Sequence, residues 1–271
     1  MDLGVTLVAE LLALGVVAGF LAGLLGVGGG MMMVPVMTLL LSQRGVPAGP
    51  AVKMAIATSM ATIMFTSIAS VRAHHKLGNV RWDIARRMAP GLVAGGLIAG
   101  AGAFAVIKGQ ALALLFAVFI GYMALQMLVG RQPKPSRQMP GAAGQAAVGG
   151  GIGFLSALVG AGGAFMSVPF MTWCNVAPRQ AVGTSAALGF PIALASTAGY
   201  VISGWGLPGA VPGAVGYLYL PALALVSMAS MSLAPVGART AQRLNLATLK
   251  RLFAFLLLAL AASMLHRAWA A

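Results

Sequence analysis

The sequence predicts an all-α polytopic membrane protein with two inverted-topology repeats, each a glycine-broken hairpin followed by three transmembrane helices. Sixty per cent of the 271 residues are hydrophobic and 7% are charged, with a mean hydropathy of +0.95; a soluble domain has about 25% charged residues. Most of the chain falls into apolar runs of about twenty residues, the length that a helix needs to cross a hydrocarbon core. The third observation is a glycine-rich stretch that occurs twice.

The duplicated stretch reads GFLAGLLGVGGGMMMVPVM at residues 19–37 and GFLSALVGAGGAFMSVPFM at residues 153–171, an offset of 134 positions. Each copy is an apolar run, a glycine break and a shorter apolar run that contains a proline. Helices interrupted at corresponding places in two halves are typical of the binding site of a transporter.

The first half, residues 1–130, begins with an apolar run from Val5 to Leu25, and the run after the break is too short to span. We therefore expect a hairpin over residues 5–42 that enters the bilayer, turns near its middle and leaves on the same side. Backbone at that depth has to be covered by protein or by a watery cavity. The full spans expected after it are 51–71, 88–107 and 111–129.

A polar, proline-rich segment at 131–144 is expected to be a cytoplasmic linker to the second half, residues 145–271. That half has a hairpin at 146–174, spans at 182–202, 217–236 and 246–265, and an uncharged loop at 203–213. Because a hairpin returns to its starting face and three spans follow it, the second repeat is expected to lie upside down.

Charge supports this topology. Thirteen of the seventeen Lys and Arg residues fall on the face that the inverted arrangement assigns to the cytoplasm, and both termini then lie outside it. The net charge of +14 is explained by this bias, without a nucleic-acid partner. The start of the chain, Met1-Asp2, lacks a basic region, so we expect a retained membrane segment and no cleaved signal peptide.

The glycine breaks are the first candidate site. Each break starts a new helix, whose free N–H groups and positive dipole end favour an anion. We expect Gly28–Met31 to face Gly162–Phe165 near the midplane and to form a small electropositive cavity. The backbone candidates are Gly28, Gly29, Gly30, Met31, Gly162, Gly163 and Ala164. The alternative is close helix packing, which we expect for the stripe Gly15, Gly19 and Gly23.

Hydroxyl groups are the second candidate. Thr58-Ser59 aligns with Thr184-Ser185, and Thr66 and Ser70 lie near Thr58 on the helical wheel. Hydroxyl donors can replace part of the hydration shell of an oxyanion, but they also bond to their own helix or to a neighbour.

The sequence gives little support for a catalytic site or a metal site. The acids are Asp2, Glu10 and Asp83, which leaves almost nothing for a carboxylate proton relay. His74 and His75 are adjacent, so they cannot face one ligand from one helix, and no metal site or cofactor is expected. We expect both histidines at the membrane edge, where a gate or pH sensor stays open as an alternative.

Four segments together resemble the sulfite exporter TauE/SafE family, over nearly the whole chain: the duplicated glycine stretch, AVGTSAAL (181–188), HHKLGNVRWDIARRMAPG (74–91), and APVGARTAQRLNLATLKRLFAFLLLALAASML (234–265). The resemblance implies a permease for sulfite, sulfonates and related sulfur-containing anions. The first half reads AIATSMAT (55–62) where the second reads AVGTSAAL, so it lacks the glycine before Thr-Ser.

We therefore expect a multi-pass transporter of the bacterial inner membrane, a secondary carrier or facilitator for a small sulfur-containing anion such as sulfite or an organosulfonate. The expected partners are that anion and the lipid bilayer, with no nucleic acid; a homo-oligomer stays open. The alternative is a channel-like passive anion pore, which the scarcity of membrane acids favours. A membrane enzyme or accessory subunit is the third hypothesis.

Overall fold

The computed structural model describes residues 4–25, 29–129, 136–207, 211–241 and 246–270. Its helices are α1 (Val5–Leu25), α2 (Gly30–Gln43), α3 (Ala48–Lys76), α4 (Trp82–Ile98), α5 (Phe104–Val106), α6 (Gly109–Val129), α7 (Ala142–Val159), α8 (Ala164–Trp173), α9 (Pro178–Gly204), α10 (Leu220–Thr240) and α11 (Leu246–Ala270). A π-helical turn at Ala99–Ala103 joins α4 to α5, and a two-stranded antiparallel ribbon, β1 (Ala214–Val215) with β2 (Leu218–Tyr219), precedes α10.

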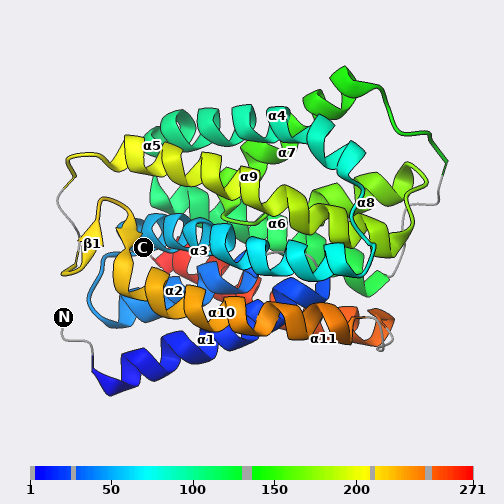
Figure 1. Cartoon of the computed structure of the whole chain (residues 1–271). Coiled ribbons are helices and arrows are strands. Elements are labelled where there is room, and N and C mark those ends of the chain that lie inside the picture. Colours follow the sequence, from blue (N-terminus) through cyan, green and yellow to red (C-terminus); the bar gives the residue numbers. More distant parts are fainter. Residues whose placement is uncertain (1–3, 26–28, 130–135, 208–210, 242–245, 271) are drawn as a thin grey trace.

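The described helices form one bundle whose long axis is horizontal in Figure 1. Seven helical stretches in the described part are long and apolar enough to cross a membrane: α1, α3, α4 through α5, α6, α7, α9 and α10. The prediction of an all-α polytopic membrane protein is therefore confirmed.

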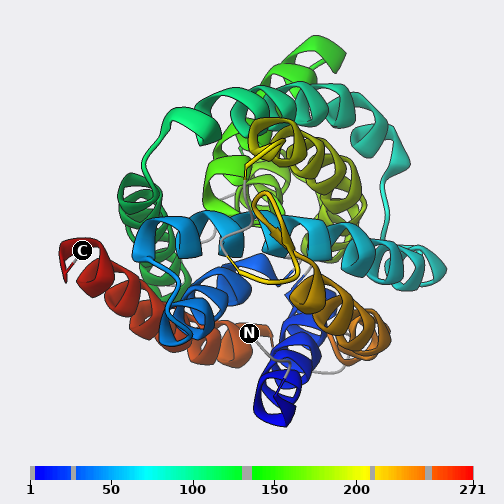
Figure 2. The same ribbon diagram turned by 90° about the vertical axis from the view of Figure 1, so that its left-hand side faces the viewer.

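The core is formed around α3 and α9, which pack against each other. In their most apolar windows 72% of the residues of α3 and 61% of those of α9 are buried, more than in any other of the seven stretches. An end-on view shows α3 crossing the bundle with other helices on both sides (Figure 2).

The two halves of the chain make matching contacts. Helix α1 packs along α10 and α7 packs along α4, while α2 lies on α3 and α8 lies on α9. The stripe Gly15, Gly19 and Gly23 lies against the backbone of α10, so the packing role expected for it is confirmed.

Most helices are longer than predicted, because their ends include polar residues. Helix α3 extends from the predicted 51–71 to Lys76, and His74, His75 and Lys76 occupy its last turn, where positive charge favours a helix end. The ribbon β1–β2, just after the predicted loop 203–213, was not expected.

The turn of the first hairpin, predicted near mid-depth, falls on residues 26–28, which lie outside the described residues, so it stays a prediction. With 21 residues, α1 is about 31 Å long, and no polar residue interrupts its second half. It runs past the start of α2, because Gly29 lies against the carbonyl of Ala18 while the carbonyl of Gly23 reaches His74 near the end of α3. The short helices do begin mid-bundle: Gly30 lies against Ile63 of α3, and Gly163 against Ile192 of α9.

Candidate functional site

The two short helices start in the same way. Gly29 and Gly163 precede α2 and α8 with φ of 73° and 76°, in the left-handed region that favours glycine. Neither helix start has a side-chain cap, so first-turn N–H groups are left for other acceptors.

The two breaks meet beside the middle of α3. The carbonyl of Gly160 lies against Gly30 and accepts a hydrogen bond from Ser59 Oγ at 3.3 Å. The structure thus brings Gly30 to Gly160, whereas contact with Gly162–Phe165 was expected. Gly28, which was also expected there, lies outside the described residues.

Thr58 and Thr184 are engaged in equivalent interactions with the chain itself. The hydroxyl of Thr58 accepts a hydrogen bond from the N–H of Tyr219 at 3.0 Å, and that of Thr184 accepts one from the N–H of Arg81 at 2.9 Å. Tyr219 and Arg81 are the residues just before α10 and α4. These hydrogen bonds therefore hold the starts of α10 and α4 against α3 and α9.

The neighbouring serines, Ser59 and Ser185, are fully buried, and their hydroxyls also form hydrogen bonds within the chain. Ser59 bonds to Gly160, and Ser185 accepts a hydrogen bond from Ser167 Oγ at 3.1 Å. Met31 and Ala164, two of the predicted backbone candidates, are buried at the starts of α2 and α8.

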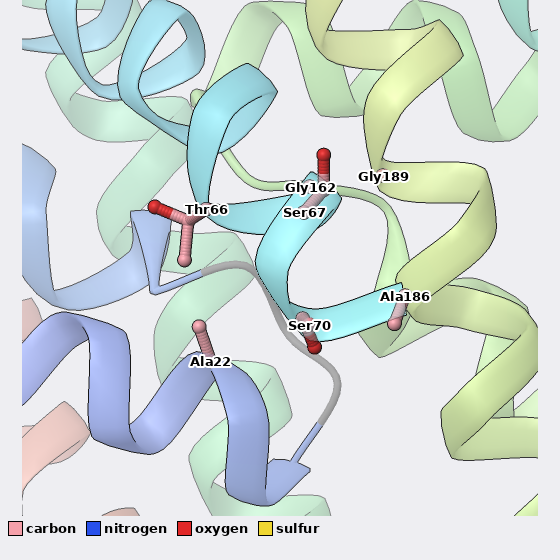
Figure 3. A pocket seen from close by; sticks show the side chains of 7 residues that line it. All are labelled: Ala22, Thr66, Ser67, Ser70, Gly162, Ala186 and Gly189. Carbon is pink, nitrogen blue, oxygen red and sulfur yellow. The ribbon is translucent and has the colours of Figure 1, made fainter. Parts of the chain in front are cut away.

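A small cavity, with room for about one water molecule, lies next to the second break (Figure 3). Its lining comes from α1, α3, the break itself and α9: Ala22, Thr66, Ser67, Ser70, Gly162, Ala186 and Gly189. Of the predicted backbone candidates, Gly162 is the one that lines it. Ser70 was noted only as a neighbour of Thr58 on the helical wheel.

The hydroxyls of the cavity differ in their partners. Thr66 Oγ1 lies 2.6 Å from Ser230 Oγ, and Ser67 Oγ donates to the carbonyl of Met64 at 3.0 Å. Ser70 Oγ is buried and has no hydrogen-bond partner in the described part of the chain. Since buried hydroxyls are normally paired, Ser70 is the group best suited to bind a ligand oxygen.

The equivalent place in the other half is filled by larger side chains. When the Thr-Ser pairs are aligned, Ala186 and Gly189 of α9 correspond to Met60 and Ile63 of α3, and Thr66 corresponds to Ile192. All three large residues are fully buried. The terminal methyl of Ile63 lies against Gly30, and that of Ile192 against Gly163. The cavity therefore lies beside the second break, and side chains fill the equivalent place beside the first break.

The described residues that line the cavity include no charged side chain. Glu10 lies on α1 and pairs with Arg44 at 2.7 Å, and Asp83 pairs with Arg81 at 2.7 Å. Within the described residues no group of three His, Cys, Asp or Glu side chains is arranged to hold a metal ion. The site therefore offers backbone N–H groups and hydroxyls, which suit an anion that must also be released.

Comparison with known proteins gives consistent matches. The family model described as sulfite exporter TauE/SafE matches residues 11–264. A probable membrane transporter protein of Haemophilus influenzae is 34% identical over 96% of this chain and 98% of its own length. One from Methanocaldococcus jannaschii is 24% identical over 87% and 86%, and YunE of Bacillus subtilis, also named a probable membrane transporter protein, is 28% identical over 72% and 78%. No solved structure matches the chain.

Proposed function

Because this chain is a multi-pass membrane transporter of the sulfite exporter TauE/SafE family, we propose that it moves a small sulfur-containing anion across the bacterial inner membrane. Sulfite and organosulfonates are the substrates that we propose. The family name supports the sulfur chemistry, and the relatives named as transporters support the activity.

The observation that carries the proposal is the cavity at the start of α8. Gly162 lines it, Gly163 precedes α8 with a positive φ, and the hydroxyl of Ser70, which has no partner among the described residues, lies in its wall. An anion there is attracted by the positive end of the helix dipole, and it can accept hydrogen bonds from the backbone N–H groups of the break and from the hydroxyl of Ser70. Because no Lys or Arg is among the described residues that line the cavity, the anion can also leave.

The matching contacts support an inverted repeat. The left-handed glycines Gly29 and Gly163 recur, and so do the bonds from Thr58 and Thr184 to the starts of α10 and α4. The positive charge is concentrated at the end of the bundle where α3 reaches Lys76, so we assign that end to the cytoplasm. Ser70 lies near it, and we propose that the cavity opens toward the cytoplasm.

A carrier is favoured over a passive pore. Met60, Ile63 and Ile192 are fully buried, and Ile63 and Ile192 lie against Gly30 and Gly163 of the two breaks. A pore that conducts without a conformational change needs a continuous polar path, and these three side chains interrupt it.

The test is initial uptake into proteoliposomes that contain the purified protein, with a panel of sulfite, thiosulfate, sulfoacetate and taurine. Saturable uptake that is accelerated by the same unlabelled anion inside supports a carrier. Flux that rises linearly with concentration and shows no exchange supports the pore. Flux equal to that of protein-free liposomes for the whole panel contradicts the proposed substrate class.

A further inference from the structure

We propose that His74 binds a proton together with the transported anion, so that the mouth of the cavity is a site of proton–anion co-transport. The inference rests on the proposed function and adds the coupling ion to it. The chain has almost no membrane acids for that role, and the sequence placed His74 and His75 at the membrane edge, with a gate or pH sensor as the alternative.

His74 is not itself in the cavity lining, but it lies next to two residues that are, one on α3 and one on α1. It lies one helical turn beyond Ser70 on α3, on the same face, because residues four apart are neighbours on a helix. Its Nε2 atom is 3.0 Å from the carbonyl oxygen of Gly23 on α1, the residue after Ala22. Ser70 and Ala22 both line the cavity. The side chain is 2% exposed.

The hydrogen bond to Gly23 fixes the roles of the two ring nitrogens. A carbonyl oxygen can only accept, so Nε2 carries a hydrogen and donates it. Nδ1 of the neutral ring is then the basic nitrogen, and it has no hydrogen-bond partner among the described residues. Ser70 Oγ is unpartnered as well. Two adjoining buried groups beside one cavity thus lack partners, and an anion can accept from both once Nδ1 is protonated.

The charges near His74 are positive, so the transported anion is the group that can balance the charge of a protonated His74. Exposed cations lie near this end of α3, α9 and α10, namely Arg72, Lys76, Arg179 and Arg239, and His75 is exposed and bonded to Trp82. The carboxylates of the described part, Glu10 and Asp83, are each paired with an arginine. A buried cation without a counter-charge is costly. Proton binding and anion binding therefore favour one another, which is reciprocal linkage between two ligands.

The competing role is structural, since the same hydrogen bond holds the end of α1 on α3. His74→Gln separates the two roles, because the glutamine amide can donate to Gly23 in place of Nε2 but does not titrate. His75→Gln is the matched control, an exposed histidine one residue away.

The experiment measures initial uptake of labelled sulfite by proteoliposomes between about pH 6 and pH 8, the range in which histidine titrates, with a pH dye inside. Sulfite itself gains a proton in this range, so each wild-type rate is divided by the His74→Gln rate at the same pH. We expect this ratio to fall about tenfold across the range, and wild-type uptake to acidify the interior more than His74→Gln uptake per anion carried.

The ratio of wild type to His75→Gln should stay constant. A wild-type to His74→Gln ratio that does not change with pH overturns the inference while leaving sulfite transport intact. Absence of sulfite uptake by the wild type overturns the proposed sulfite substrate and this inference together. A His74→Gln protein that does not fold assigns His74 to the structural role and also contradicts the inference.

Discussion

At the scale of single residues, the buried hydroxyls divide into those that bond to the chain itself and those that have no partner among the described residues. Thr58 and Thr184 accept hydrogen bonds from the backbone N–H groups just before α10 and α4, whereas Ser70 is buried and has no hydrogen-bond partner in the described part of the chain. Both groups include Ser or Thr on α3 and α9, so residue type does not separate them. What separates them is the neighbour that packing places within reach.

The first prediction concerns Thr184→Val, which keeps the shape and removes the acceptor for the N–H of Arg81. We expect a loss of about 1 kcal/mol of stability, because that N–H then lacks its partner, and an unchanged KM for uptake. Thermal unfolding in detergent and sulfite uptake measure the two effects. Ser232→Ala, which removes an exposed hydroxyl bonded within its own helix, is the control. Unchanged stability with a raised KM would assign the hydroxyl to the anion instead.

A second prediction concerns the left-handed glycine of the second break. Gly163→Ala should cost about 1–2 kcal/mol, because a left-handed conformation is unfavourable for a residue with a Cβ, and should slow transport by tilting the start of α8. Gly151→Ala is the control, a helical glycine whose added Cβ meets nothing within 4 Å. Thermal unfolding and uptake rate are compared for the two variants. Equal behaviour would show that the start of α8 tolerates a side chain.

At the scale of elements, the sequence was informative about where helices are interrupted. The glycine breaks and the flanking apolar runs are local signals, and α2 and α8 begin within two residues of the predicted positions. The depth reached by α1 and the identity of the cavity lining depend on how α1, α3 and α9 pack. Ala22, Ala186 and Gly189 carry no chemical signal of their own, so they could not be predicted.

A third prediction concerns the two isoleucines that lie against the breaks. Ile63→Val and Ile192→Val remove the terminal methyl groups that lie against Gly30 and Gly163, at a cost of about 0.5–1.5 kcal/mol each. The double variant should leak: anion efflux without counter-anion should rise relative to exchange. Ile84→Val, at a buried position on α4, is the control. A leak no greater than that of the control would place the barrier elsewhere.

At the scale of the whole molecule, the loops at the Lys76 end of the bundle carry most of the positive charge, and the other end carries the ribbon β1–β2. This asymmetry is the basis for assigning the cytoplasmic side. Arg243, which the sequence also assigns to that side, lies outside the described residues, so the exposed Arg239 takes its place in the test.

Cysteine labelling of inverted and right-side-out vesicles is the fourth prediction. Cysteines at Arg81 and Arg239 should react from the cytoplasmic side, and a cysteine at Trp205 should react from the opposite side. Cys174→Ser removes the native thiol, which is buried and whose pKa is raised by that burial, so its background reaction is slow in any case. Labelling of positions 81 and 239 from opposite sides would contradict the inverted repeat.

The central claim is that the anion binds in the cavity beside the start of α8. Gly189 is a helical residue of its lining, and a Cβ there would lie 3.2 Å from Cβ of Ser67, so Gly189→Ala narrows the cavity without straining the backbone. Initial sulfite uptake as a function of concentration is the measurement, with Gly151→Ala as the matched control. A KM raised about tenfold, equivalent to about 1.4 kcal/mol of binding, in Gly189→Ala and unchanged in Gly151→Ala is the predicted result. Wild-type kinetics in both variants would contradict the claim.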